Sequence, residues 1–330
     1  MNADPKRLAN KILSGDRRSL ARGITLIESA RPDHQEQAQV LVEMLLPHTG
    51  HAIRLGITGT PGAGKSTFIE AFGIHVIGES EQIAVLAVDP SSQRSGGSIL
   101  GDKTRMQRLS LDRNAYIRPS PAGMTLGGVA RKTREAAILC EAAGFSVIVL
   151  ETVGVGQSET TVADMVDCFL LLLAPGAGDE LQGIKRGIIE TADLVLVNKA
   201  DGDLLATANL VQSDYQAALH LLRPASPSWT PEVLTCSALK GDGIDQVWKA
   251  IKRHRQALEK SSELQAKRQR QHQSWFWSEV QASLIDALQQ DPKSTALMRD
   301  LEDQINKGTM LPPEAARRLI RKFRAKADTA

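Results

Sequence analysis

The stretch from Gly59 to Ser66 reads GTPGAGKS, a sequence suited to holding the phosphates of a nucleotide. It fits the pattern G-x-x-x-x-G-K-[ST], in which glycines let backbone N–H groups turn inward around an anion. Lys65 is expected to reach the β- and γ-phosphates, and the Ser66 hydroxyl to ligate Mg²⁺. The nucleotide contacts predicted in this loop are Gly59, Pro61, Gly62, Ala63, Gly64, Lys65, Ser66 and Thr67.

A second polar motif, Asn198-Lys199-Ala200-Asp201, fits N-K-x-D and follows the apolar run 194–197. The Asp201 carboxylate can accept hydrogen bonds from both guanine N1–H and the exocyclic amine of guanine. Adenine has no such donor pair on that edge, and would leave the carboxylate without partners. The motif therefore predicts that Asn198, Lys199 and Asp201 select GTP over ATP.

A shorter stretch, Ser237-Ala238-Leu239, follows the run 233–236. It resembles the backbone segment that GTPases lay against the base, so all three residues are predicted nucleotide contacts. On its own the stretch is equally compatible with a simple turn.

Glu151 begins the sequence ETVG directly after the apolar run 147–150, where GTPases usually carry D-x-x-G. A carboxylate there can orient the Mg²⁺ shell, and the Gly154 N–H can reach the γ-phosphate. Because Glu is one methylene longer than Asp, we expect Glu151 to act through water or on a switch rather than by a direct metal bond. Val155 stands where many GTPases place a water-positioning Gln, which predicts slow intrinsic hydrolysis that a partner stimulates.

Two further aspartates are candidate Mg²⁺ ligands beside Ser66 and Glu151. Asp89 ends the apolar run 83–88, and Asp102 lies in the glycine-rich stretch 94–103. Hard carboxylate oxygens next to phosphate suit Mg²⁺. The alternatives are a turn carboxylate before a proline for Asp89 and a helix N-cap for Asp102. The glycines favour a mobile loop, as a nucleotide switch requires.

A third glycine-containing loop, 175–185, reads PGAGDELQGIK. Its polar residues can face the nucleotide or a partner, although a helix cap and a helix surface explain them equally well. The candidate catalytic residues are therefore Lys65, Glu151, Asp179, Gln182 and Lys185.

The elements that must position these motifs alternate between strands and helices. Continuous apolar runs are typical of parallel strands buried on both faces. Strands are expected at 52–58, 83–88, 115–118, 145–150, 168–173, 194–197 and 233–235, with helices such as 66–72, 133–143 and 179–190 between them. This order predicts an α/β fold with a doubly wound, mostly parallel sheet. Ligands in such sheets bind at the carboxyl ends of the strands, which is where the motifs lie.

The domain boundaries follow from where the strands stop. Residues 51–255 are predicted to form the P-loop GTPase domain, 1–50 an N-terminal helical extension, and 256–330 a C-terminal helical arm. The arm carries an apolar stripe formed by Trp275, Phe276, Trp277, Val280, Leu284, Ile285 and Leu288. Its last helix, expected over 313–326, is rich in Arg and Lys. That basic face is either solvated or a surface for a partner or for self-association.

Composition narrows the class of protein. The chain has 330 residues and a formal net charge of +2, so no overall basic field favours nucleic acid or an anionic membrane as a partner. Cys140, Cys168 and Cys236 lie in apolar or mixed runs without C-x-x-C spacing, which predicts small buried side chains in a reducing compartment. Neither a secretory signal nor a membrane-spanning run is visible, so we expect a cytoplasmic protein.

Taken together, the motifs resemble those of the MeaB/ArgK family of P-loop GTPases across most of residues 1–290. The stretches that carry the resemblance are TGTPGAGKST (58–67), AVDPSS (87–92), GGSILGDKTRM (96–106), CEAAGF (140–145), ETVGVGQSE (151–159), PGAGDELQGIK (175–185), NKAD (198–201) and CSAL (236–239). In this family the position of Glu151 is also a glutamate.

The resemblance implies an SRP-like GTPase core with switch loops at 89–105, 151–160 and 176–188, and a C-terminal arm through which the protein forms a homodimer. It implies GTP as substrate, Mg²⁺ as cofactor, and an adenosylcobalamin-dependent acyl-CoA mutase of the methylmalonyl-CoA mutase type as partner. The GTPase would gate cofactor loading and help to protect or reactivate the mutase. An alternative is a kinase of an arginine/ornithine transport binding protein. A nucleic-acid-linked regulator that uses the basic C-terminal helix is a third class.

Overall fold

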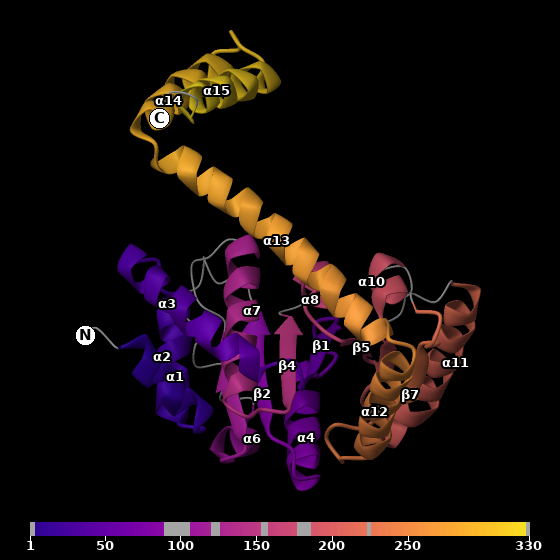
Figure 1. Ribbon diagram of the computed structural model, residues 1–330. Helices are drawn as coiled ribbons and strands as arrows, with labels where there is room; N and C mark the ends of the chain where they lie inside the picture. The colour runs from indigo at the N-terminus through magenta and orange to yellow at the C-terminus, as the bar shows by residue number, and fades with distance from the viewer. Residues whose placement is uncertain are drawn as a thin grey trace. The chain divides into compact units, whose positions relative to one another are not determined.

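The computed structural model describes residues 4–88, 106–119, 126–152, 158–176, 186–222 and 226–327. Two compact units are distinguished, 1–271 and 272–330, and each is treated by itself. The larger unit contains a sheet with helices on both faces (Figure 1).

The sheet has seven strands in the order β3-β2-β4-β1-β5-β6-β7, and every neighbouring pair is parallel. The strands are β1 (Ile53–Gly59), β2 (Ile83–Val88), β3 (Ala115–Arg118), β4 (Val147–Thr152), β5 (Cys168–Leu173), β6 (Leu194–Val197) and β7 (Glu232–Thr235). The chain winds from the central β1 to one side as far as β3, returns through β4, and then builds the other side through β5 to β7. The doubly wound sheet expected from the sequence is confirmed, and it is parallel throughout.

One face of the sheet is covered by α4 (Lys65–Gly78), α6 (Gln107–Leu111) and α12 (Ile244–Lys260). Successive side chains of a strand point to opposite faces. Leu55 and Ile57 of β1 belong to the core beneath these helices. Between them, Gly56 faces the other side, where an added Cβ would lie 2.7 Å from the Phe169 ring and 3.1 Å from Val162. A glycine here lets α8 (Ser158–Ala163) approach the sheet closely.

Three helices precede the sheet: α1 (Pro5–Leu13), α2 (Arg17–Glu28) and α3 (Pro32–Leu45). They match the helical character expected for residues 1–50. Asp4 caps α1 by accepting from the Lys6 N–H at 3.1 Å, and Asp16 caps α2 by accepting from the Ser19 N–H at 2.6 Å. The helices pack on α7 (Leu126–Ala142), where an added Cβ on Gly23 would lie 2.8 Å from Leu139.

The other helical elements complete the inventory of the described residues. They are η1 (Leu46–His48), α10 (Arg186–Thr191), η3 (Gly202–Leu204), α11 (Leu205–Leu221), α13 (Glu263–Gln290), α14 (Pro292–Asn306) and α15 (Pro312–Ala327). The boundary between the two compact units falls within α13. Across the described ranges, none of the helices combines the length and the apolar character needed to cross a membrane.

In the smaller unit, α14 and α15 pack together around a small contact that buries Leu301 and Ala315. The Asp291 carboxylate caps α14 by accepting from the Ser294 N–H at 2.9 Å. Part of the apolar stripe of α13 remains uncovered in this unit. Its exposed members are Phe276, Trp277, Leu284 and Ile285, which retain 61%, 62%, 58% and 54% of their accessible surface.

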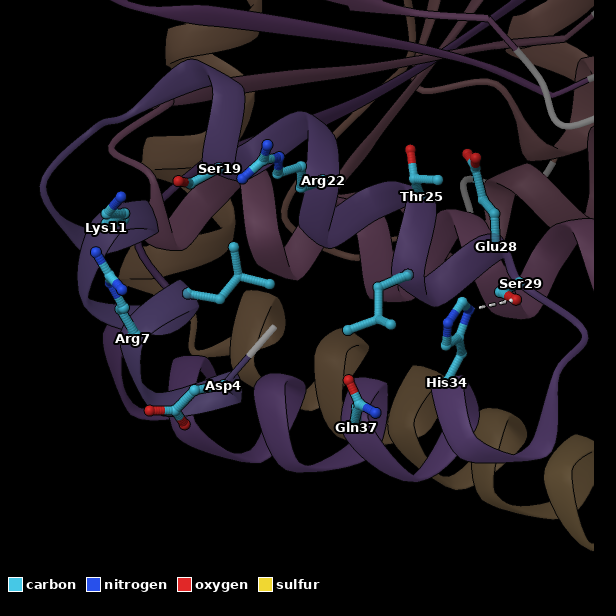
Figure 2. A pocket seen from close by; sticks show the side chains of 12 residues that line it. Asp4, Arg7, Lys11, Ser19, Arg22, Thr25, Glu28, Ser29, His34 and Gln37 are labelled. Carbon is cyan, nitrogen blue, oxygen red and sulfur yellow. Dashed lines mark hydrogen bonds between the residues drawn. The ribbon is translucent and has the colours of Figure 1, made fainter. Parts of the chain in front are cut away.

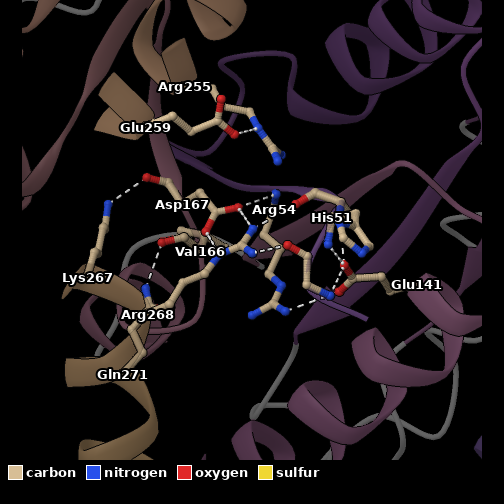
Figure 3. A network of polar contacts seen from close by, with 12 residues as sticks. His51, Arg54, Glu141, Val166, Asp167, Arg255, Glu259, Lys267, Arg268 and Gln271 are labelled. Carbon is tan, nitrogen blue, oxygen red and sulfur yellow. Dashed lines mark hydrogen bonds and ion pairs between the residues drawn. The ribbon is translucent and has the colours of Figure 1, made fainter. Parts of the chain in front are cut away.

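The first turns of α13 are fixed to the amino end of the sheet by Arg268. Its guanidinium donates to both carboxylate oxygens of Asp167 at 2.8 Å, and also to the carbonyl oxygens of Gly50 and Ala52. The bidentate geometry is the strong form of this pairing. The side chains converge in Figure 3.

Glu141, near the end of α7, completes this network. One carboxylate oxygen accepts from the backbone N–H groups of Gly50, His51 and Ala52 at 2.5 to 2.8 Å. The other oxygen accepts from Arg54 at 3.1 Å. The contacts hold the chain where it enters β1, and β1 leads directly to the phosphate loop.

Replacing Asp167 with asparagine is expected to destabilise the protein by about 3–5 kcal/mol at neutral pH, because the mostly buried Arg268 would lose the carboxylate that it contacts directly. Burial alone would raise the pKa of the Asp167 carboxyl, but hydrogen bonds from Arg268 and the charges of Arg268 and Arg54 hold it below its ordinary value. This contribution to stability is therefore present above the unfolded pKa of about 3.9 and is lost as the pH falls through the folded pKa.

Urea unfolding measured between neutral and acidic pH tests both parts of this prediction. The Asp167→Asn variant should be less stable at neutral pH and should lose less stability than the parent on acidification. Asp245→Asn is the matched control, because Asp245 is exposed and pairs with Lys249 on the surface. Equal stability of the parent and Asp167→Asn at neutral pH would contradict the assignment.

Candidate nucleotide site

The loop between β1 and α4 has the backbone shape that phosphate binding requires. Gly62 and Gly64 have φ angles of +83° and +87°, a region that favours glycine. An added Cβ on Gly64 would lie 2.7 Å from the Asn198 side chain, and one on Gly59 would lie 2.3 Å from the Leu172 carbonyl oxygen. Gly64 is therefore needed for both shape and close approach, Gly62 for shape and Gly59 for close approach. The helix α4 then begins at Lys65, so its positive dipole end faces the loop.

Lys65 is folded back over this loop. Its ammonium group donates to the Gly59 carbonyl oxygen at 2.7 Å and to the Thr60 carbonyl oxygen at 3.3 Å. Burial lowers the pKa of Lys65, while the carboxylates of Glu151 and Glu159 partly oppose that shift. A partly buried cation held by carbonyl groups is ready to exchange them for phosphate oxygens, which are stronger partners.

Ser66 and Glu151 bring two hard oxygen donors together next to Lys65. The Ser66 hydroxyl donates to a Glu151 carboxylate oxygen at 3.4 Å, and Glu151 is buried. Glu151 lies on β4, opposite Ile57 of β1 in the parallel register. A hydroxyl and a carboxylate side by side at the phosphate loop fit the donor preference of Mg²⁺.

Asn198 links the phosphate loop to the predicted base-binding segment. Its amide nitrogen donates to the Ala63 carbonyl oxygen at 2.9 Å, and its carbonyl oxygen accepts from the Ala238 N–H at 3.0 Å. The side chain is 2% exposed. Asn198 therefore uses both ends of its amide to hold two loops together, a contact that the sequence pattern did not reveal.

The structure brings Asp201 and Ser237 into contact. The Ser237 hydroxyl donates to the Asp201 carboxylate, and it also accepts from the Lys240 N–H at 3.2 Å. Lys199, between Asn198 and Asp201, has a φ of +58°, which is uncommon for a residue with a side chain. Such conformations cluster at functional sites, where the surrounding structure maintains them.

Two features near the phosphate loop were not assigned a role from the sequence. The Thr152 hydroxyl donates to the Thr58 hydroxyl at 2.9 Å, joining the ends of β4 and β1. Glu159, at the start of α8, is buried, and its charge acts on Lys65. Glu159 is the last residue of ETVGVGQSE, one of the stretches that carry the family resemblance, and this was the sign of it in the sequence.

The remaining predicted site residues divide into two groups. Pro61 of the loop and Thr67 of α4 are exposed, and Leu239 is 82% exposed. Asp89, Asp102, Gly154, Asp179, Gln182 and Lys185 lie outside the described residues. The three cysteines are free and buried, as expected.

The structure thus brings three features together at the carboxyl end of the parallel sheet. They are the phosphate loop, the oxygen donors of Ser66 and Glu151 that suit a metal ion, and the Asp201 carboxylate of the N-K-x-D motif. The family profile described as methylmalonyl Co-A mutase-associated GTPase MeaB matches residues 20–293. The chain belongs to the MeaB family. It is therefore a P-loop GTPase, a hydrolase that acts on GTP.

Individual relatives of this MeaB-family chain are similar over nearly its whole length. A protein from Caulobacter vibrioides named putative GTPase is 56% identical, and the match covers 97% of this chain and 98% of that protein. The mouse methylmalonic aciduria type A homolog, mitochondrial, is 48% identical over 97% of this chain and 80% of its own length. The crystal structure of an LAO/AO transport system kinase is similar with a TM-score of 0.77 and 39% identity, covering 98% of this chain and 99% of that chain.

Proposed function

We propose that this MeaB-family GTPase is a GTP-driven chaperone of an adenosylcobalamin-dependent acyl-CoA mutase of the methylmalonyl-CoA mutase type. It would gate loading of the cofactor and protect or reactivate the mutase. The observation that carries the proposal is the match to a family described as mutase-associated over residues 20–293. The mouse relative, named for methylmalonic aciduria, agrees with this direction.

The site supports a nucleotide cycle that requires Mg²⁺. Ser66 would ligate the ion and Glu151 would orient its water shell, and the ion would neutralise charge between the β- and γ-phosphates when bound. Lys65 would leave the Gly59 and Thr60 carbonyls and bind the phosphates. We further propose that Asp89 and Asp102 complete the metal shell, that the Gly154 N–H reaches the γ-phosphate, and that Asp179, Gln182 and Lys185 act during hydrolysis.

We also propose that residues 256–330 form a dimerisation arm in a cytoplasmic homodimer. The exposed stripe of Phe276, Trp277, Leu284 and Ile285 supports this proposal, because an apolar face of this kind marks an interaction surface. A second copy of the chain offers the same stripe, so a symmetric pairing would cover both.

The competing function is a kinase of a transport binding protein, which the name of the similar crystal structure favours. The two functions differ in where the γ-phosphate goes. A chaperone GTPase releases it to water, whereas a kinase transfers it to a protein hydroxyl or another acceptor group.

The test measures phosphate release from GTP by the full chain with and without the mutase from the same organism. We expect the mutase to raise turnover at least about tenfold, which corresponds to ~1.4 kcal/mol of barrier. Adenosylcobalamin transfer into the apo-mutase, followed by absorbance, should require GTP. Unchanged turnover together with GTP-independent loading would contradict the chaperone role, and radiolabel appearing on a transport binding protein would support the kinase.

A further inference from the structure

The N-terminal helices enclose a groove that shares no residue with the nucleotide site. It lies among α1, α2 and α3 and has a volume of about 820 Å³. Small-molecule sites commonly have volumes of ~300–1,000 Å³, so the groove is large enough for one organic ligand. Figure 2 shows the side chains that line it.

Three cations gather at one end of this groove. Arg7 and Lys11 lie one turn apart on α1, and Arg22 projects from α2 (Figure 2). All three are exposed, and none of their side chains makes a hydrogen bond or ion pair with a residue in the described ranges. Like charges four residues apart on a helix repel each other. The Asp16 carboxylate acts on Lys11 through its charge, but no ion pair in the described ranges joins an acid to any of the three side chains.

The two acids that line the groove have other partners. Asp4 caps the start of α1 through the Lys6 N–H. Glu28 forms an ion pair with Arg118 of β3, which donates to both of its carboxylate oxygens. The Glu28 charge is thus offset by Arg118, whereas Asp4 keeps its charge near Arg7 (Figure 2). Three cations then stand against one lining acid at that end, which leaves it electropositive.

The rest of the groove is apolar and then polar. Leu8 and Leu26 contribute apolar lining. At the opposite end, His34 and Ser29 are joined by a hydrogen bond of 2.8 Å between the ring Nδ1 and the hydroxyl (Figure 2). The sequence of environments from cationic to apolar to polar matches a ligand with an anionic head and an apolar body.

We infer that this groove binds an amphipathic organic anion, with its phosphate or carboxylate head on Arg7, Lys11 and Arg22 and its apolar body along Leu8 and Leu26. Guanidinium groups suit this role because their planar fork matches both anions. The inference does not depend on the chaperone role, since it concerns a different part of the larger unit.

The experiment is calorimetric titration of n-octyl phosphate into the full chain saturated with GDP and Mg²⁺, which keeps the probe out of the nucleotide pocket. We expect one site per chain in the parent. Inorganic phosphate, which lacks the body, and n-octyl glucoside, which lacks the charge, should each bind at least tenfold more weakly. Sodium octanoate then tells whether a carboxylate head can replace phosphate with similar affinity.

The variants locate the binding. Arg7→Gln with Arg22→Gln should weaken octyl phosphate binding at least tenfold, while circular dichroism shows that the exposed substitutions leave the fold intact. Arg18→Gln is the matched control, because Arg18 is an exposed arginine of α2 that does not line the groove. Absence of binding in the parent, equal affinity in the double variant, or the same loss in Arg18→Gln would each overturn the inference.

Discussion

Replacing Lys65 with alanine is expected to lower GTP turnover by at least about 100-fold, the scale on which removal of one preorganised donor to developing charge acts. The Lys65 side chain lies over the phosphate loop, and its ammonium group donates hydrogen bonds to the Gly59 and Thr60 carbonyl oxygens. Without it, the β- and γ-phosphates lose their positive partner in a partly buried site, where electrostatic effects are stronger than in water.

A second variant at Lys65 separates the effect of the charge from that of the side-chain shape, and a variant at another lysine serves as the control. Lys65→Met retains the length of the side chain without its charge, so it should lose as much turnover as Lys65→Ala. Lys249→Ala is the control, because Lys249 is an exposed lysine of α12 whose partner is Asp245. Turnover is measured as phosphate release at saturating GTP and Mg²⁺, with thermal unfolding to show that each variant is folded. Normal turnover in Lys65→Met would refute the role of the charge.

The phosphate loop could be predicted from sequence because its chemistry is local. Gly62 and Gly64 have positive φ angles, and α4 begins at Lys65, one residue before the predicted helix at 66–72; these are properties of neighbouring residues. Asn198 was harder to interpret. Its two hydrogen bonds join Ala63 to Ala238, segments far apart in the chain, and only the folded sheet brings them to one edge.

The limits of β4 show how neighbouring strands alter a local prediction. The apolar run indicated a strand at 145–150, whereas β4 runs from Val147 to Thr152. It lies between β1 and β2, and the register pairs Glu151 with Ile57 and Thr152 with Val88. Backbone pairing on both sides therefore extends the strand through two polar residues, which places Glu151 on a rigid element at the phosphate loop.

The apolar stripe of α13 illustrates a different limit. Helical periodicity predicts which residues share a face, but it does not say what covers that face. In the smaller unit Phe276 and Trp277 remain exposed and their rings pack against each other, with centroids 5.5 Å apart. The sequence alone could equally have described a helix that buries these rings against its own sheet.

Replacing Asp201 with asparagine is expected to weaken GTP binding by about 100-fold and to favour xanthosine triphosphate, in which a carbonyl replaces the 2-amine. The carboxylate accepts from guanine N1–H and from the amine, and hydrogen bonds to a charged group are each worth about 1.5–3 kcal/mol. An asparagine amide can still accept from N1–H, but its NH₂ group opposes the guanine amine and suits the xanthine carbonyl. The Ser237 hydroxyl, which now donates to Asp201, would hold the new side chain in a similar place.

Equilibrium titration with fluorescent GTP, XTP and ATP analogues measures this change in preference. Asp203→Asn is the matched control, because Asp203 is an exposed acid two residues further along the chain, in η3. It should leave the ratio of GTP to XTP affinity unchanged, since its carboxylate is not part of N-K-x-D. If Asp201→Asn also left that ratio unchanged, the base would be read elsewhere. If Asp201→Asn reversed the ratio of GTP to XTP affinity and kept the normal dependence on Mg²⁺, base selection would be separable from phosphate and metal binding. This is expected because Lys65, Ser66 and Glu151 form the phosphate and metal end, and none of their described hydrogen bonds involves Asp201.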